Sequence, residues 1–299
     1  MKTKWLSYLI LLALIDTINA QKLETGLFEA NIYLPVGSFT QGVEGPAVDS
    51  EGILYAVNYK YEGTIGKVSP EGKASVFITL PDSSIGNGIR FNSRGDMIIA
   101  DYTGHNILKI NMKSNEITVV VHDSRMNQPN DIAIDSKDNI YISDPNWKDS
   151  TGNLWMMDTR NQLTLLESEM GTVNGIEVSP DDKKLYVNET IQRTVWSYDL
   201  SKDGKISNKK LIHRFSDFGL DGMRCDAAGN LYITRYGKGR VVKMSPEGKI
   251  LKEILLVGKN PSNLTFGGED GRTIYVTLQD MGNIEFFRVD TPGARFNRN

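Results

Sequence analysis

The sequence predicts an all-β fold: a six-bladed β-propeller with four antiparallel strands in each blade. Six segments of the chain share one pattern of polar and apolar residues, and their starts lie 43, 43, 44, 47 and 42 residues apart. Within each segment, short alternating or β-branched runs lie between turn residues, and no stretch keeps a helical period. A repeat of a little over forty residues with four strands is the size of a propeller blade, whereas a linear β-solenoid uses much shorter units.

Each repeat begins with two strands joined by a turn rich in Asp, Ser, Gly and Pro. A third strand follows the pair in every repeat, as in TIGKVS and NLWMMD, and a fourth follows in five repeats, as in ASVFIT and EITVVV. The first two strands read EGPAVDSEGILYAVN from Glu44, NGIRFNSRGDMIIAD from Asn87, NDIAIDSKDNIYISD from Asn130, NGIEVSPDDKKLYVNE from Asn174, DGMRCDAAGNLYITR from Asp221 and NLTFGGEDGRTIYVTL from Asn263.

The two ends of the chain predict how the ring closes. The sixth repeat ends at Val289-Asp290 without a fourth strand, while the stretch from Phe28 to Pro35 is a strand without a repeat of its own. If residues 28–35 pair with residues 284–289, the last blade is complete and no strand edge is left open. Residues 21–299 then form one propeller domain.

The first twenty residues have the composition of a signal peptide. Lys2 and Lys4 precede the apolar run from Trp5 to Ile15, and Ala20 offers a small residue for cleavage. The run is too short to span a bilayer, and a buried first helix is the alternative. The sequence therefore predicts a secreted or periplasmic protein that is free of the membrane after cleavage.

Charge and residue counts exclude several other classes of protein. Cleavage after Ala20 removes two lysines and one aspartate and moves the net charge from −3 to −4, so nucleic acid is not an expected partner. Cys225 is the only cysteine and there are three histidines, which excludes an intramolecular disulfide and disfavours a zinc site. There is no Gly-rich phosphate loop and no G-x-S-x-G motif. We expect a small-molecule substrate, and a monomer or a small homo-oligomer.

One polar position recurs at the start of the first strand in every repeat, beside the axis of the expected ring. Turn preference alone accounts for asparagine there, but it explains a glutamate poorly and does not explain why all six residues carry side-chain oxygens. A ring of oxygens with two carboxylates suits a hard divalent cation, calcium or magnesium rather than zinc or copper. Four positions later, apolar residues such as Val48 and Cys225 are expected to pack between blades. We call the six polar residues the collar: Glu44, Asn87, Asn130, Asn174, Asp221 and Asn263.

The second strand of each repeat runs back toward the collar, so its last residues are expected to surround a ligand-sized mouth. Taken singly, each of these residues is as well explained by a solvated loop. The candidates for substrate contact are Asn87, Tyr102, Gln128, Asp144 and Tyr236.

These residues resemble the gluconolactonase family, which includes regucalcin and the luciferin-regenerating enzymes. The similarity runs from Glu44-Gly45-Pro46 to the sixth repeat, and its most specific parts begin at Gln128, Asn174, Asp221 and Asn263. It implies a calcium-dependent lactonase, with Mg²⁺, Mn²⁺ or Zn²⁺ as other possible cations. The metal ligands implied are Glu44, Asn174 and Asp221, with Asn130 close by.

The resemblance also implies roles in hydrolysis. Asp221 corresponds to the residue that activates water, and Asn130 is placed to hydrogen-bond the lactone oxygen. Gln128 departs from the animal sugar lactonases, which have arginine there, so specificity for aldonolactones is not implied. His105 and His122 are alternative bases. Two other functions stay open: a propeller that binds a ligand or protein without catalysis, and hydrolysis of aryl esters or phosphotriesters at the same site.

Overall fold

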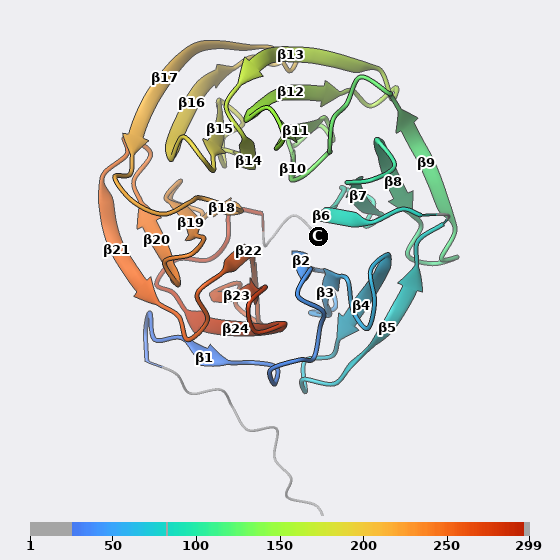
Figure 1. Ribbon diagram of the computed structural model, residues 1–299, viewed down its shortest axis with the longest axis vertical. Coiled ribbons are helices and arrows are strands. Elements are labelled where there is room, and N and C mark those ends of the chain that lie inside the picture. The colour runs from blue at the N-terminus through green and yellow to red at the C-terminus, as the bar shows by residue number, and fades with distance from the viewer. Residues whose placement is uncertain (1–25, 82, 296–299) are drawn as a thin grey trace, which may run out of the picture.

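The computed structural model describes residues 26–81 and 83–295. In this part of the chain there are β-strands and no helix, and hence no helix that could cross a membrane. The strands form six separate four-stranded antiparallel sheets, arranged as blades around one axis (Figure 1). The predicted six-bladed propeller is confirmed. The predicted signal peptide, residues 1–20, lies outside the described residues.

The blades follow the order of the repeats. Blade 1 contains β2 (Glu44–Val48), β3 (Leu54–Val57), β4 (Thr64–Val68) and β5 (Ala74–Thr79); blade 2 contains β6 (Gly86–Phe91), β7 (Met97–Asp101), β8 (Asn106–Ile110) and β9 (Ile117–His122); blade 3 contains β10 (Ile132–Ile134), β11 (Ile140–Asn146), β12 (Thr151–Met157) and β13 (Leu163–Met170). Blade 4 contains β14 (Val173–Val178), β15 (Lys184–Glu189), β16 (Thr194–Leu200) and β17 (Ile206–Arg214); blade 5 contains β18 (Met223–Cys225), β19 (Leu231–Arg235), β20 (Arg240–Met244) and β21 (Ile250–Leu255). Blade 6 contains β22 (Pro261–Gly267), β23 (Thr273–Leu278), β24 (Asn283–Arg288) and the N-terminal β1 (Asn31–Ile32).

The hydrophobic core lies between the blades. Six clusters of buried apolar side chains each join two neighbouring blades; in one, Tyr141 and Leu154 of blade 3 pack with Val187 and Tyr198 of blade 4. Burial of apolar side chains on both faces of each sheet is the main contribution to the stability of the fold. The apolar residues four positions after the collar belong to these clusters, as expected; Cys225 is 3% exposed.

The chain ends close the ring as the sequence predicts. Asn31 of β1 pairs antiparallel with Phe286 of β24, and the backbone NH groups of Phe28 and Tyr33 donate to Arg288 and Ile284. Side chains then anchor the segment: the Tyr33 ring lies edge-on to the Phe286 ring at 5.8 Å between centroids. Blade 6 therefore has strands from both ends of the chain, and its outer edge is covered.

Candidate functional site

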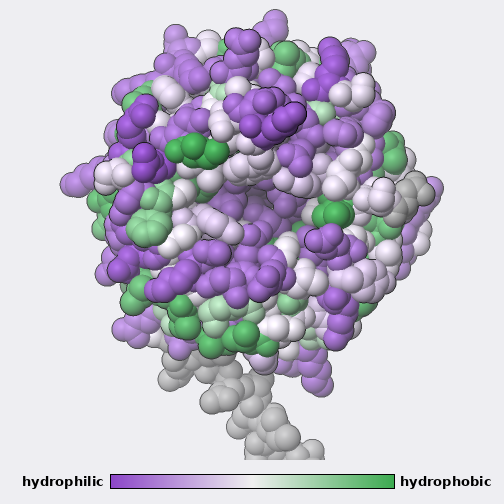
Figure 2. Space-filling model, viewed as in Figure 1, coloured by the Kyte–Doolittle hydropathy of each residue, from purple (hydrophilic) through white to green (hydrophobic). Residues whose placement is uncertain are grey.

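The six collar residues lie within two residues of the first residue of each innermost strand, where neighbouring blades meet. All are buried except Asn87, which is partly buried. Hydrogen bonds to the backbone carbonyls of collar residues connect neighbouring blades. The NH of Gly88 in blade 2 donates to the carbonyl of Asn130 at 2.8 Å, and the side chain of Asn188 in blade 4 donates to the carbonyl of Asp221 at 2.6 Å. On the face drawn in Figure 2 the molecule is hollowed at its centre, and hydrophilic residues line the hollow.

Glycine follows the collar residue in four of the blades because the next blade is too close for a side chain. A Cβ at Gly222 would lie 2.0 Å from Oδ1 of Asn263, and a Cβ at Gly45 would lie 1.9 Å from the carbonyl oxygen of Asn87. Gly45 also has a φ of +55°, which favours glycine. The motifs E-G, N-G and D-G of the sequence therefore reflect how tightly the inner strands approach one another.

Two buried carboxyl groups of the collar destabilise each other's charged form. Burial raises the pKa of Glu44 to about 7, and the negative charge of Asp131 adds to the rise. Burial also raises the pKa of Asp221 well above its usual range, and the neighbouring Glu44 and Asp131 raise it further. Among the described residues, neither Glu44 nor Asp221 forms an ion pair with a basic side chain, whereas Asp131 does. A cation bound between them would offset this repulsion.

The amide residues of the collar also offer free oxygens. Oδ1 of Asn130 and Oδ1 of Asn174 are buried and accept no hydrogen bond. The amide nitrogen of Asn174 donates to Thr190 at 3.1 Å, which leaves its oxygen for another partner. Buried acceptors without partners are costly, and a hard cation would satisfy both. The donor set of two carboxylates and two amides thus fits a divalent cation. It is not a group of His, Cys, Asp and Glu alone, and in residues 26–81 and 83–295 no three such residues are arranged so that they could hold a metal ion by themselves.

A second layer of charge, which the repeat pattern did not predict, lies next to the collar. Asp131 is fully buried, and its two oxygens accept from Arg90 at 3.2 Å and from Arg224 at 3.1 Å. Glu177 lies 3.5 Å from the other side of the Arg90 guanidinium. This region therefore contains four carboxylates, those of Glu44, Asp131, Glu177 and Asp221. It contains two guanidiniums, those of Arg90 and Arg224, so two negative charges are left without a counterion. A divalent cation would balance them.

The mouth residues differ in how far they can reach a substrate. Tyr102 is partly buried, and burial raises the pKa of its hydroxyl; hydrogen bonds with Trp147 and Gln128 oppose the rise, and the charge of Asp221 adds to it. Tyr236 is also partly buried and donates to Oε1 of Gln279 at 3.0 Å. These tyrosines, with Gln128 and Asn87, remain available at the mouth.

Asp144 is placed differently from the expectation. It has no exposed surface, and its carboxylate accepts from the backbone NH groups of Asn127 and Gln128, both at 2.7 Å, and from the indole of Trp155 at 2.9 Å. Its oxygens are therefore occupied by the protein. Asp144 fixes the loop that carries Gln128, and direct contact with a substrate is not consistent with this burial.

The two alternative histidine bases lie away from the innermost strands. His122 is exposed at the end of β9, the outer strand of blade 2, and its Nδ1 lies 2.8 Å from Oδ1 of Asn106. His105 lies in the turn between β7 and β8 with a φ of +55°.

The chain also matches known proteins over most of its length. The family model described as "SMP-30/Gluconolactonase/LRE-like region" matches residues 43–280. The chain belongs to this family. This family member is 26% identical over 297 residues to a gluconolactonase of Zymomonas mobilis subsp. mobilis, with 86% of this chain and 81% of the relative covered.

Other matches differ in what they are named for. A 6-deoxy-6-sulfogluconolactonase of Pseudomonas putida is 33% identical over 129 residues, which cover 42% of this chain and only 44% of the relative. A diisopropyl-fluorophosphatase of Loligo vulgaris is 27% identical over 287 residues, which cover 85% of this chain and 91% of the relative. The solved structure of a regucalcin from Agrobacterium tumefaciens str. C58 has a TM-score of 0.74 at 20% identity, with 87% of this chain and 96% of that chain covered.

Proposed function

We propose that this protein is a calcium-dependent hydrolase that opens a lactone, either a sugar lactone or a related cyclic ester. The observation that carries the proposal is the collar: two buried carboxylates, Glu44 and Asp221, beside two buried amide oxygens without partners, on Asn130 and Asn174. The relatives named gluconolactonase support the substrate class. The exclusively oxygen donor set favours calcium, with magnesium or manganese next and zinc least.

The residues of the collar divide the work of hydrolysis between them. When bound, the cation supplies Lewis-acid polarisation of the substrate carbonyl. Glu44, Asn130, Asn174 and Asp221 would hold it. Asp221 takes a proton from the attacking water as the water oxygen bonds to the carbonyl carbon, and it returns that proton to the ring oxygen as the carbon–oxygen bond of the lactone breaks. Asn130, which lies in blade 3, two blades from Asp221, orients the lactone.

The mouth residues act on the rest of the substrate. Tyr102 and Gln128 lie on one side, and Tyr236 with Gln279 lies on the other, so hydrogen-bonding groups face a bound ring from two directions. Asp144 acts indirectly because it holds the backbone at Gln128. We also infer that the protein is exported and that residues 1–20 are removed; the N-terminal residue of the mature protein tests this.

Asp221→Asn separates a catalytic role from a ligand role. The amide keeps an oxygen of nearly the same shape, so calcium should still bind at saturation, but it cannot accept a proton, and loss of a general base costs about 10²–10⁴ in rate. Asn174→Asp is the matched control because it keeps the oxygen and adds a charge. We expect metal in both variants by calorimetry and measurable turnover only in Asn174→Asp. Near-normal turnover of Asp221→Asn at saturating calcium would show that Asp221 is a ligand and not the base.

A second candidate, hydrolysis of phosphotriesters at the same site, is favoured by the similarity to diisopropyl-fluorophosphatase across most of both chains. Sugar lactones, aliphatic lactones, aryl esters and phosphotriesters should be compared with and without chelator. Lactone turnover that chelation abolishes supports the first proposal, and turnover of phosphotriesters alone supports the second. Calcium binding without turnover of any of these substrates would favour a propeller that binds ligand without catalysis.

A further inference from the structure

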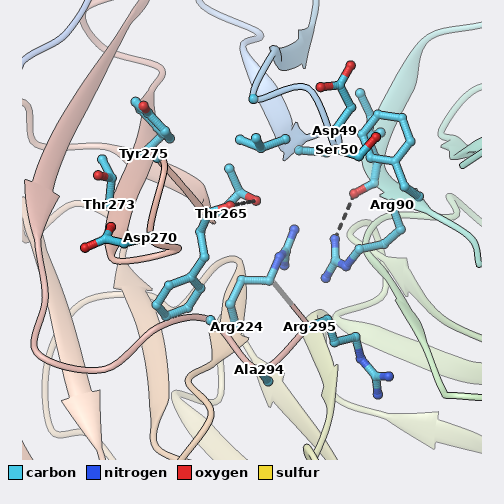
Figure 3. Close-up of a pocket in the computed structure, with 18 of the residues that line it drawn as sticks. Asp49, Ser50, Arg90, Arg224, Thr265, Asp270, Thr273, Tyr275, Ala294 and Arg295 are labelled. Carbon is cyan, nitrogen blue, oxygen red and sulfur yellow. Dashed lines mark hydrogen bonds between the residues drawn. The ribbon is translucent and has the colours of Figure 1, made fainter. Parts of the chain in front are cut away.

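A large cavity opens at the end of the axis opposite the collar. Its volume is about 1250 Å³. Its lining includes Val48, Phe91 and Cys225, which end the innermost strands β2, β6 and β18, whereas the collar lies at the start of these strands. The cavity is therefore separate from the candidate active site. Figure 3 shows it, with Asp49 and Ser50 on one wall and Tyr275 on another.

The inner end of this cavity presents two guanidinium groups. Figure 3 shows Arg90 and Arg224 reaching toward each other from opposite sides, with Thr265 beside them. Arg224 is 6% exposed; its Nη1 donates to Asp131 and to the carbonyl of Met223, while its Nη2 has no partner. The Arg90 guanidinium donates to Asp131 and to the carbonyl of Ile89, and its distance to the Glu177 carboxylate is 3.5 Å. A buried N–H donor beside a second positive charge is a place where an anion is favourable.

Most of the other charged groups at the cavity are paired or lie at its outer edge. Asp49 accepts from the backbone of its own turn and from Tyr55, Asp270 pairs with Arg288 at 2.6 Å, and Arg295 pairs with Asp182 at 2.9 Å. Glu51 and Glu269 are exposed at the rim. Two N–H donors of the lining residues have no hydrogen-bond partner: Nη2 of Arg224, at the inner end, and Nε of Arg295.

The walls between the rim and the guanidiniums are largely apolar. Phe91 and Phe266 line the cavity from blades 2 and 6, and both are partly buried. The C-terminal segment completes the wall: the NH of Ala227 donates to Pro292 at 2.8 Å, and the NH of Ala294 donates to the carbonyl of Cys225 at 3.0 Å. Residues 292–295 thus lie along blades 5 and 4, and Ala294 lines the cavity next to the strand that carries Arg224.

We propose that this cavity is a second ligand site, which binds a small carboxylate with an apolar or aromatic body. The carboxylate accepts from Nη2 of Arg224 and from the Arg90 guanidinium, and the body contacts Phe91 and Phe266. The site shares no residue with the collar, and Asp131 connects its two arginines electrostatically to the collar carboxylate Glu44. Charged and aromatic groups in one partly enclosed space are the usual composition of a small-molecule site.

Benzoate is the probe, and neutral benzamide of nearly the same shape is its control. Calorimetry is done with chelator present, so that a metal in the collar cannot bind the carboxylate. We expect benzoate to bind one to one and at least about tenfold more tightly than benzamide, since one charge-assisted contact has about that effect. Equal binding of the two, or no benzoate binding in chelator, would overturn the proposal.

Ala294→Glu places a negative charge in the cavity without touching either arginine, and Ala294→Gln is its control of equal size. We expect Ala294→Glu to weaken benzoate binding by about tenfold or more through like-charge repulsion, while Ala294→Gln binds as the unmodified protein does. Equal effects of the two substitutions would contradict the proposal. Independently of any variant, anomalous scattering from a crystal soaked with 4-iodobenzoate should place iodine beside Phe91 and Phe266; iodine bound only at the collar face would refute it.

Discussion

Asp131→Asn tests whether the charge layer beneath the collar stabilises the fold. The carboxylate has no exposed side-chain surface and accepts from Arg90 at 3.2 Å and Arg224 at 3.1 Å, whose side chains are 14% and 8% exposed. Removing one partner of a buried ion pair costs about 3–5 kcal/mol because the other charge is left without compensation. Relief of the repulsion with Glu44 and Asp221 offsets part of this cost. We expect the free energy of unfolding to fall by about 3 kcal/mol.

The measurement is denaturant unfolding with chelator present, so that metal binding does not contribute. Asp158→Asn is the matched control: Asp158 pairs with Arg160 at 2.8 Å, but the Arg160 side chain is 75% exposed, and we expect a much smaller loss. If the two substitutions destabilise the protein equally, the buried carboxylate is not the counterion that holds the two arginines. A loss restored by replacing Arg224 with leucine in the Asp131→Asn background would identify the unpaired guanidinium as its cause.

Three further predictions concern the collar. Gly222→Ala should lower the free energy of unfolding by about 1–3 kcal/mol and weaken calcium binding, because its Cβ would meet Asn263 at 2.0 Å; unchanged denaturation and calorimetry would contradict this close packing. Chelation of protein shown to carry metal should lower the melting temperature, since a cation at a hundredfold excess over Kd adds about 2.7 kcal/mol; an unchanged melting curve would count against a structural role. Calcium affinity should fall as the pH drops below about 7, the pKa to which burial raises Glu44, because protons then compete with the ion. The stability of the metal-free protein should change in the opposite sense, decreasing as the pH rises from 4.5 to about 7, because the folded state holds the proton more tightly; a flat profile in both measurements would refute the assignment.

The repeat pattern predicted the blades and the collar because equivalent residues of a propeller occupy equivalent places around one axis. It did not predict the layer formed by Arg90, Glu177 and Arg224, although each lies three residues after its collar residue. If side chains alternated strictly along the strand, the collar residue and the residue three positions after it would lie on opposite faces of the sheet. The inner strands β2, β6, β14 and β22 contain register shifts near their starts, and an extra residue there changes which side chains face the axis.

The misplacement of Asp144 has a similar local cause. The repeat pattern predicted that Asp144 ends the second strand, where side chains are expected to surround the mouth. In the structure β11 continues to Asn146 and pairs Asp144 with Asn153 of β12, so the carboxylate lies inside the blade. Pro145 lies within this extension and pairs with Gly152, and the next residue, Asn146, pairs with Thr151.

The ring closure also sets an order of events during synthesis. Asn31 emerges from the ribosome early, but its partner Phe286 emerges only after most of the chain has been made. At about 5–20 residues per second, β1 waits on the order of tens of seconds for β24. The other five blades can form from neighbouring strands in that time, so blade 6 is expected to be the last to assemble. The brevity of β1, two residues, limits the unpaired edge that the nascent protein exposes to other chains while it waits.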